Sequence, residues 1–343
     1  MKKNMPNSVS VLHISSEQME KEFIRILRSR GFSNEKSETI ARVFTENSLD
    51  GVYSHGVNRF SRFVKYVDEK CIDTDAEPEK KSCAGAIEQW DGNSGPGILN
   101  AIISTSRAMK IADEFGIGCV ALANTNHWMR GGTYGWQAAK AGYAFIGWTN
   151  TTGNMPAWGA IDSRLGNNPL VIAVPYKKEA IVLDMAASQF SYGKMEAARN
   201  KNESLPLPGG YDKNGNLTTD PSAILETGRL LPMGYWKGSG MALLLDLLAA
   251  ILAGGLSTHE ITRYKYEHNL SQIFIAINIL KLGKGSMISK TVNDIIDDFQ
   301  NSLPASGSEK ILYPGERVLR CREENSLNSI PVELNIWEEI ISL

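Results

Sequence analysis

The most constraining feature of this chain is a pair of short apolar runs separated by only five residues. The runs are Leu170–Val174 and Ala180–Met185, and Pro175–Glu179 joins them. Apolar runs of this length, bounded by turn signals, are typical of buried strands. A parallel pair needs a crossover of about a dozen residues or more, whereas a tight turn is enough for an antiparallel pair. The sequence therefore predicts an antiparallel hairpin here and a mixed sheet around it.

The middle of the chain supplies further strands. Ile117–Ala123 and Tyr143–Asn150 are apolar runs of strand length, and the pattern over Thr133–Ala141 predicts a helix between them. Gln272–Ile279 is a strong strand pattern in the last third of the chain. Asn200–Asp220 is rich in Gly, Pro and Asn, which predicts a long loop.

Both ends of the chain have a helical pattern. Over the first ninety or so residues, apolar side chains recur at helical spacing in three stretches. Ser15 with Gln18 forms a capping-box pattern, and a second helix is predicted from about Ser33 to near Gly51. The side chains expected to face inward are Met19, Phe23, Ile26, Leu27, Ile40, Val43, Phe44, Phe60, Phe63, Val64 and Val67.

The last third returns to helix over Met241–Ala253 and Val292–Leu303. A chain of 343 residues is long enough for two domains. We therefore expect an α/β protein in which residues 1–85 and 240–343 form a discontinuous helical domain. Residues 86–239 would form a mixed-sheet domain.

Composition excludes several classes of protein. The 36 basic and 38 acidic residues leave a net charge of −2, and no basic block offers a surface for nucleic acid. The apolar run Met241–Leu256 is shorter than a membrane span and contains Asp246, so it predicts a buried helix rather than a membrane anchor. Met1–Val11 is polar and lacks the apolar core of a signal peptide.

The cysteines and histidines give no metal-site pattern. Cys71, Cys83, Cys119 and Cys321 are widely scattered without CxxC spacing, which argues against a zinc site and a disulfide framework and fits reduced thiols in a cytoplasm. No histidine pair has the spacing of a zinc-binding helix, so we expect no metal centre.

One segment combines the side chains needed to reduce a 2-keto acid. Gly51–Phe60 places His55 four residues before Arg59. If a helix begins near Ser54, the two side chains share one face and can converge on a small ligand. Histidine suits proton transfer at neutral pH, and the planar guanidinium matches a carboxylate. The alternative is a surface His and a surface Arg that flank a helix start.

His127 is the second histidine of interest. It follows the apolar run that ends at Ala123, where side chains leave a sheet and can line a cleft. A hydrogen-bonded loop histidine is an equally good interpretation of the pattern alone.

The chain has no GxGxxG turn, which is the usual sequence sign of a dinucleotide-binding fold. Gly131–Gly135 is closest, but its first spacing is wrong and its glycines can simply serve a turn. Gly238–Gly240 lacks the third glycine, although its amides can hold a phosphate at a helix start. Pro232–Gly238 offers an aromatic ring and a cation for a nucleotide, or it can be a packed connection between domains.

Five motifs in one order resemble the type 2 malate/L-lactate dehydrogenase-like family, which is unrelated in fold to the Rossmann-type lactate dehydrogenases. The resemblance extends from about Ser15 to the carboxyl end. The motifs are Val52–Phe60, Asn126–Gly132, Tyr134–Ala139, Leu231–Met241 and Ser271–Ile277.

The resemblance implies a non-Rossmann nicotinamide-binding fold on a mixed sheet, a helical domain from both chain ends, and a homodimer. It also implies that His55 is the proton donor. Arg59 would bind the substrate carboxylate and His127 a substrate oxygen. The cofactor contacts implied by the motifs are Ala180, Ile181, Val182, Leu183, Asp184, Met185 and Ala186, then Trp236 and Lys237, and finally Gly315, Glu316 and Arg317.

These features predict a cytoplasmic reductase of a sugar-derived 2-keto acid that uses NAD or NADP, with NADH favoured. The first alternative is another dehydrogenase activity of the same family, with malate, lactate, ureidoglycolate or a cyclic imino acid as substrate. A nucleotide-binding protein that has lost catalysis is the alternative from another class. Because the acid, the carboxylate ligand and the cofactor segments are all present, we favour the enzyme.

Overall fold

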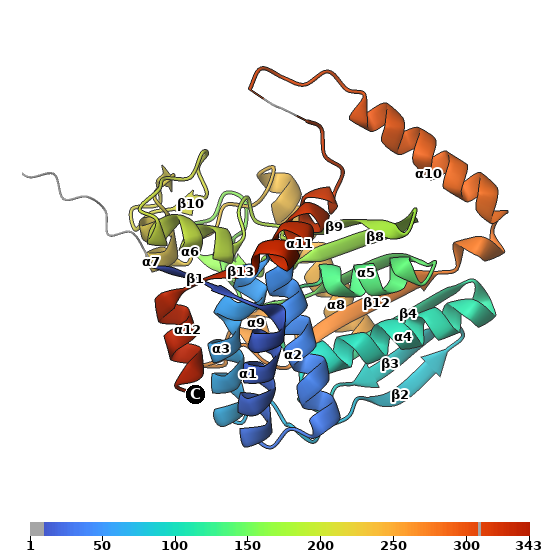
Figure 1. Cartoon of the computed structure of the whole chain (residues 1–343), viewed down its shortest axis with the longest axis horizontal. Helices are drawn as coiled ribbons and strands as arrows, with labels where there is room; N and C mark the ends of the chain where they lie inside the picture. The colour runs from blue at the N-terminus through green and yellow to red at the C-terminus, as the bar shows by residue number, and fades with distance from the viewer. Residues whose placement is uncertain (1–9, 308–309) are drawn as a thin grey trace, which may run out of the picture. The chain divides into compact units, whose positions relative to one another are not determined.

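The computed structural model describes residues 10–307 and 310–343 (Figure 1). The chain divides into two compact units. Unit 1 contains the residues up to Lys70 together with Glu316–Leu343, and unit 2 is Cys71–Gly315. The boundaries expected near residues 85 and 240 both fall inside unit 2, which also holds a late strand of the sheet. The polar segment Met1–Val11 lies mostly outside the described residues.

Unit 1 is built on three helices from the amino-terminal part, α1 (Ser16–Ser29), α2 (Asn34–Leu49) and α3 (Val57–Asp68). The carboxyl end adds α11 (Glu316–Asn328) and α12 (Leu334–Ile341). Strands β1 (Val11–Ile14) and β13 (Ile330–Glu333) form an antiparallel pair. One unit is therefore assembled from both chain ends.

The predicted helix starts at Ser15 and Ser33 and the predicted inward faces in unit 1 are confirmed. The Ser15 and Ser33 hydroxyls accept backbone N–H groups of the first turns of α1 and α2. Phe23 and Phe60 stack with ring centroids 3.9 Å apart, and Phe44 meets Phe60 edge-on at 5.2 Å. These fully buried rings anchor the three helices to one another.

Unit 2 is organised around a seven-stranded sheet of order β2-β3-β4-β12-β5-β8-β9. The strands are β2 (Glu79–Ala84), β3 (Ile87–Asp91), β4 (Ile117–Thr125), β12 (Leu270–Ile277), β5 (Ala144–Thr149), β8 (Leu170–Tyr176) and β9 (Glu179–Met185). In this sheet β3 and β4 pair in parallel and the other neighbours pair antiparallel. The predicted mixed sheet and the β8–β9 hairpin are confirmed.

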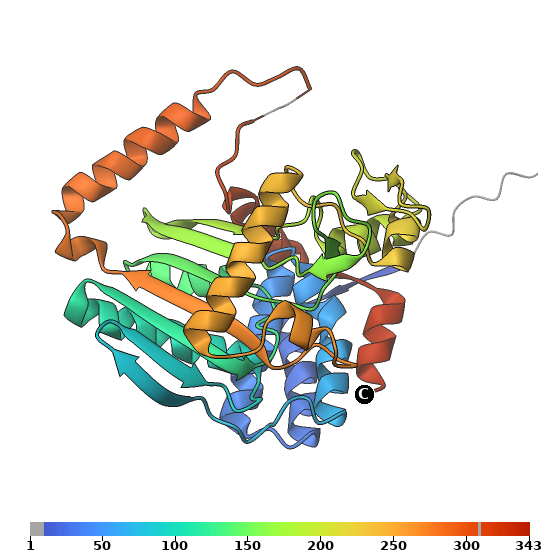
Figure 2. The same ribbon diagram turned by 180° about the vertical axis from the view of Figure 1, so that it is seen from behind.

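Helices cover both faces of this sheet. On one face lie α4 (Gly97–Phe115) and α5 (Gly132–Lys140), and on the other lies α8 (Trp236–Ala253) (Figures 1 and 2). Successive residues of β12 alternate between the faces. Phe274 packs on Trp128 and Tyr134, whereas Ile273 belongs to the cluster that contains Leu245 and Ala249 of α8. The central strand therefore joins two cores.

Smaller elements surround the end of the sheet. They are β6 (Met155–Pro156), β7 (Ser163–Leu165), α6 (Tyr192–Asn200), β10 (Gly210–Tyr211), β11 (Leu217–Thr218), α7 (Pro221–Thr227) and α9 (Thr258–Ile261). The expected long loop at Asn200–Asp220 contains the two-residue strands β10 and β11. After β12, the short helix η2 (Ile279–Lys281) leads to α10 (Gly285–Gln300), which extends away from the sheet (Figure 1).

One sequence-based expectation, a fully helical first ninety residues, is wrong at its end. Residues Glu79–Asp91 form β2 and β3 instead. All six side chains of β2 are exposed, so this edge strand lacks the apolar alternation that identifies a half-buried strand. Gly85, at φ +61°, turns the chain between the two strands.

The expectation of a buried helix over Met241–Leu256 is also only partly met. Ala242, Leu245 and Ala249 are buried. The opposite face of α8 exposes Leu243, Leu244, Leu247, Leu248 and Ile251 by 45% to 69%. By length and composition α8 alone among the described helices could cross a membrane, but this is weak support for a span because a helix on a soluble core meets the same test.

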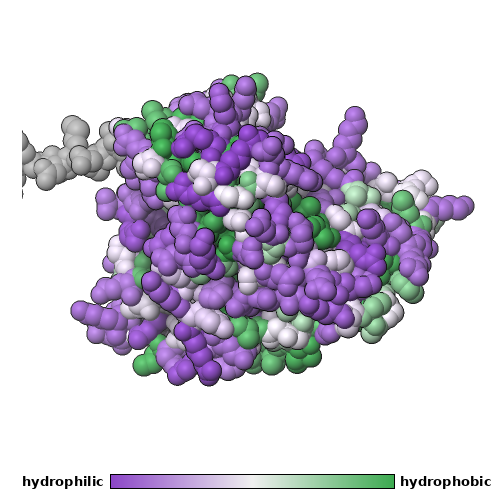
Figure 3. All heavy atoms as spheres, turned by 90° about the horizontal axis from the view of Figure 1, so that it is seen from below, coloured by the Kyte–Doolittle hydropathy of each residue, from purple (hydrophilic) through white to green (hydrophobic). Residues whose placement is uncertain are grey.

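The exposed apolar side chains of α8 form a continuous face. On the side of the molecule seen in Figure 3, hydrophilic residues predominate and hydrophobic ones gather in small groups. Apolar surface in one stripe usually marks a contact with another molecule.

Candidate active site

Two distant segments meet at the end of β9 in unit 2. The Met233 N–H donates to the Ala187 carbonyl at 2.8 Å, and the Gly238 N–H donates to the Met233 carbonyl at 2.8 Å. A Cβ at Gly238 would lie 2.7 Å from the Ala187 oxygen, so only glycine permits this approach. The start of α8, with Trp236 and Lys237, is thereby held beside the strand that carries Ala180–Ala186.

Trp236 and Lys237 are both presented outward. Gly234 and Tyr235 have φ values of +57° and +60°, which turn the chain sharply into α8. The Trp236 side chain is 67% exposed, and Lys237 is exposed as well. An indole plane and an ammonium group are thus available next to β9. The helix begins at Trp236, five residues before the expected Met241, so Gly238 and Gly240 lie in its first turns.

A third segment meets the same strand along its outer edge. The Val182 N–H donates to the Pro314 carbonyl at 3.0 Å. The following residue, Gly315, has φ +97°, and a Cβ there would lie 3.3 Å from the Val182 nitrogen. Unit 2 therefore brings Ala180–Ala186, Trp236–Lys237 and Gly315 together on β9. Glu316 and Arg317 begin α11 in unit 1.

Asp184 is the acidic side chain of this region. Its Oδ2 accepts the Gly132 N–H at 2.8 Å, and Arg130 lies nearby. Although part of the side chain stays accessible, the crowding protein around it raises the pKa of Asp184, while Arg130 and the Gly132 N–H act in the opposite direction. The proximity of Arg130 and Asp184 was not identified by the sequence analysis, because Arg130 lies in the loop after β4 and Asp184 lies in β9.

His127 lies at the end of β4, in a loop that its neighbours hold rigidly. The Tyr134 hydroxyl donates to the Trp128 carbonyl at 2.6 Å. The Met129 N–H donates to His127 Nδ1 at 2.9 Å, so a neutral imidazole carries its proton on Nε2. The side chain is partly buried. Because β4 and β9 run in the same direction in the sheet, His127 and Ala187 lie at the same sheet edge.

In unit 1, His55 lies on a short 3-10 helix rather than on an α-helix. It ends the 3-10 helix η1 (Tyr53–His55), and α3 begins only at Val57. The condition that His55 and Arg59 share one α-helix from near Ser54 is therefore not met. Gly56, at φ −114° and ψ −127°, breaks the helix, because its backbone passes so close to Ser48 that a Cβ would lie 2.3 Å from the Ser48 hydroxyl oxygen.

Hydrogen bonds define the position of His55. The Asn47 side chain donates to the His55 carbonyl at 3.0 Å, and the Ser48 hydroxyl accepts the Val57 N–H at 2.9 Å. The Ser54 hydroxyl and His55 Nδ1 are 3.1 Å apart. Arg59 lies in the first turn of α3, and both it and His55 are partly buried. Ser54 as a partner of the imidazole was missed by the sequence analysis, although it is the preceding residue.

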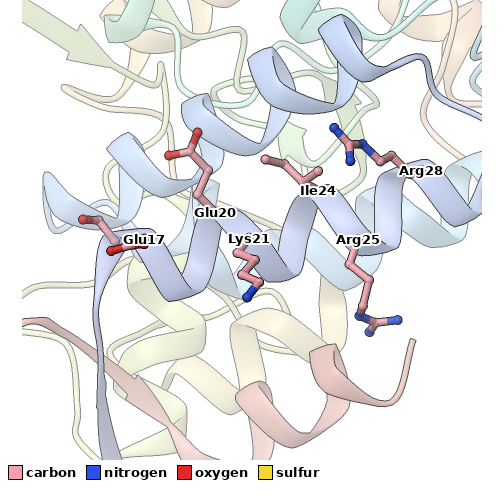
Figure 4. Close-up of a pocket in the computed structure, with 7 residues that line it drawn as sticks. Glu17, Glu20, Lys21, Ile24, Arg25 and Arg28 are labelled. Carbon is pink, nitrogen blue, oxygen red and sulfur yellow. The ribbon is translucent and has the colours of Figure 1, made fainter.

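A wide hollow of about 920 Å³ along α1 is separate from these residues. Figure 4 shows acidic side chains toward the start of the helix and basic ones toward its end. Its lining is Ser16, Glu17, Glu20, Lys21, Ile24, Arg25 and Arg28. This charge order complements the helix dipole, and none of the predicted site residues contributes to the hollow.

Comparison with known proteins gives a consistent result. The family model described as malate/L-lactate dehydrogenase matches residues 14–341. A protein of Pasteurella multocida named 2,3-diketo-L-gulonate reductase is 46% identical over 333 residues, which cover 97% of this chain and 100% of that protein. A protein of the same name from Escherichia coli O1:K1 is 44% identical with the same coverage.

Solved structures of dehydrogenases are similar to this chain over nearly its full length. Sulfolactate dehydrogenase from Methanocaldococcus jannaschii superposes with a TM-score of 0.88 at 30% identity, covering 96% of this chain and 95% of that one. A putative malate/lactate dehydrogenase from E. coli superposes with a TM-score of 0.90 at 26% identity, covering 96% and 93%.

Proposed function

The chain belongs to the malate/L-lactate dehydrogenase family, and from this premise we propose that it reduces 2,3-diketo-L-gulonate to 3-dehydro-L-gulonate with NADH. The observation that carries the proposal is the full-length identity of 43% to 46% with relatives that are named for this reaction. The activity class is an oxidoreductase acting on CH–OH groups, and its substrate is a small keto acid.

Membership in a dehydrogenase family implies a nicotinamide cofactor, and the residues on β9 fit one. We assign its binding to Ala180–Ala186, Trp236, Lys237 and Gly315, with Glu316 and Arg317 at the start of α11. Glycine at Gly315 lets the chain before α11 lie close against β9, and the Lys237 ammonium suits a phosphate. The exposed Trp236 ring suits a flat heterocycle. The bound nicotinamide supplies the hydride.

We assign the proton donor to His55. Reduction of a ketone leaves negative charge on oxygen, and a protonated imidazole neutralises it by giving up its proton. With Ser54 at Nδ1, the Nε2–H of His55 is the proton for the substrate oxygen. Arg59 would hold the substrate carboxylate through its two-pronged guanidinium. His127, whose Nδ1 already accepts from Met129, would donate its Nε2–H to a second substrate oxygen.

We further propose a cytoplasmic homodimer. The apolar face of α8, defined by Leu243, Leu244, Leu247, Leu248 and Ile251, is unlike the surface of a monomer. A second copy of the chain is the partner that would cover it, since each copy presents the same self-complementary stripe. Sedimentation equilibrium measures the resulting mass.

The test measures the rate at which NADH or NADPH is oxidised, from the fall in nicotinamide absorbance, in the presence of each acid of a panel. The panel contains 2,3-diketo-L-gulonate, pyruvate, the keto acids corresponding to malate and ureidoglycolate, and a cyclic imino acid. We expect the highest kcat/KM for 2,3-diketo-L-gulonate with NADH. A higher value for another acid would assign the chain to that activity within the family. No oxidation with any acid, together with retained NADH binding, would support a nucleotide-binding protein without catalysis.

A further inference from the structure

One face of α11 is in contact with the end of α2, just before the turn that carries His55. Three residues of α11 make these contacts, namely Cys321, Arg322 and Asn325. They occupy neighbouring positions on the helix, because residues three or four apart share a face. The contacted segment is Ser48–Tyr53, which leads directly into His55.

Arg322 holds Asp50, the residue directly after α2. Its Nε and Nη2 donate to the two carboxylate oxygens of Asp50 at 2.5 and 2.9 Å. The Asp50 side chain is only 2% exposed, and that of Arg322 is 34% exposed. A two-pronged contact to a buried carboxylate fixes direction as well as distance.

Asn325 binds the end of α2 in a second way. Its amide donates to the Leu49 carbonyl at 2.8 Å and to the Ser48 carbonyl at 3.3 Å, and it lies 3.2 Å from the Tyr53 hydroxyl. The last carbonyls of a helix have no partner within the helix; the Asn325 amide supplies a donor for the Leu49 carbonyl, while the Ser48 carbonyl also accepts the Gly51 N–H at 3.0 Å. Asn325 is itself buried, with 8% of its surface exposed.

The chain between these contacts is shaped to fit α11. Gly51 has φ +74°, and a Cβ there would lie 2.5 Å from the Cys321 sulfur. The backbone at Gly51 therefore passes α11 at a distance that permits no side chain. From Gly51 the chain reaches His55 through the single turn of η1. Movement of Ser48–Tyr53 must then move the imidazole.

The same helix begins with Glu316 and Arg317, which we assign to the cofactor. Arg317 lies one turn before Cys321, and a rise of about 1.5 Å per residue puts Arg322 about 7.5 Å further along. One rigid helix thus carries a cofactor-binding turn and two residues that fix the support of the acid.

We propose that Arg322 and Asn325 are positioning residues for His55, and that α11 sets the position of the acid relative to the cofactor-binding turn. The proposal rests on the proposed function, in which His55 donates the proton. Neither residue is required to touch the substrate.

The experiment compares Asn325→Ala and Arg322→Gln with wild type in steady-state kinetics and in hydrogen exchange of the folded protein. We expect kcat to fall about tenfold or more, as for a misplaced catalytic group, while KM for NADH changes less than about twofold. Amides of residues 52–57 should exchange faster, while those of β12 should not change. Arg322→Lys, which keeps the charge and loses one prong, should recover part of kcat.

Two control variants test whether any substitution on α11 or elsewhere in unit 1 has the same effects. Ser326→Ala removes an exposed hydroxyl that donates to the Arg322 carbonyl of the same helix. Arg25→Gln removes the ion pair with Glu22 on α1 and a hydrogen bond to the Ile341 carbonyl, both in unit 1. Both should keep kcat and the exchange of residues 52–57.

The outcomes separate this proposal from the proposed function. Unchanged exchange at residues 52–57, or faster exchange with unchanged kcat, would overturn the positioning role in an active enzyme. An equal loss of kcat in the Arg25→Gln control would show that general destabilisation, and not the position of His55, lowers kcat. A wild-type protein that reduces none of the acids would instead remove the proposed function, and the role of His55 with it.

Discussion

The backbone N–H of Val182 donates a hydrogen bond of 3.0 Å to the carbonyl oxygen of Pro314. The bond joins the edge strand of the sheet to the last residues before α11. It places Gly315 against β9, where a Cβ would lie 3.3 Å from both the Val182 nitrogen and the Trp136 ring. Within unit 2, the chain next to Gly315 and the chain that leads to Trp236 therefore contact β9 or the residues directly after it.

The first prediction concerns Gly315. Gly315→Ala should weaken NADH binding by about tenfold, because an added methyl at φ +97° both strains the backbone and displaces it from β9. Fluorescence titration measures the affinity. Gly116→Ala is the matched control, since Gly116 has φ +86° with open space around its Cβ position. Equal losses of affinity in the two variants would attribute the effect to backbone strain alone.

The second prediction tests the acid. His55→Ala should lower kcat by about a hundredfold or more, as expected for loss of a positioned general acid, with little change in NADH affinity. Ser54→Ala should cost less, because it removes only the hydroxyl at Nδ1. Steady-state kinetics provide both values. Turnover of His55→Ala within a few-fold of wild type would exclude His55 as the donor.

The third prediction tests the carboxylate ligand. Arg59→Lys should raise KM for the keto acid far more than KM for an analogue that lacks the carboxylate, because lysine cannot reproduce the two-pronged contact. The comparison of the two substrates serves as its own control. Equal increases would mean that Arg59 does not bind the carboxylate.

The fourth prediction concerns stability against acid. Arg107 donates to both oxygens of Glu88 at 2.6 and 2.8 Å. This pairing, with a smaller contribution from the Trp90 N–H, holds the pKa of Glu88 at about 2 despite burial. A carboxyl whose pKa is lowered on folding contributes stability above its ordinary value near 4.5, and this contribution is lost as pH falls toward 2.

Arg107→Gln should therefore lower the free energy of unfolding by about 2 kcal/mol or more at pH 7, and by less at pH 3. Denaturant titration at the two pH values measures the difference. Arg164→Gln breaks an ion pair with Asp162 in which both side chains are largely exposed, so it should change stability little at either pH. A pH-independent loss in Arg107→Gln would show that the ionised Glu88 is not the cause.

Much of the architecture follows from local patterns. Ser15 and Ser33 cap helices as their sequence context indicates, and the short connection after Leu170–Val174 enforces the antiparallel hairpin. β2 was missed because all its side chains are exposed, so its sequence lacks the period of a buried strand. The exposed face of α8 was missed because composition does not reveal whether a second molecule covers an apolar helix.

The site is harder to predict, since it depends on long-range contacts. The sequence suggested His55 and Arg59 on one helix, but the contact of Gly56 with Ser48 separates them. Nothing local links Asn325 to Leu49, because their hydrogen bond joins the two ends of the chain. Motif resemblance assigned three segments to the cofactor, and the hydrogen bonds from Val182 to Pro314 and from Met233 to Ala187 could not be predicted from any one of them.

The last prediction separates a Rossmann-like turn from the site on β9. A Cβ at Gly131 would lie 2.7 Å from Val171 and 2.8 Å from Trp128, so Gly131→Ala should disturb packing and lower stability without a selective effect on NADH. Trp236→Ala and Lys237→Ala change exposed side chains, so they should preserve the fold and weaken NADH binding through lost stacking and lost phosphate charge. Fluorescence quenching gives the affinity and thermal unfolding the stability of each variant. Selective loss of NADH in Gly131→Ala, with normal binding in the other two, would move the nucleotide to the start of α5.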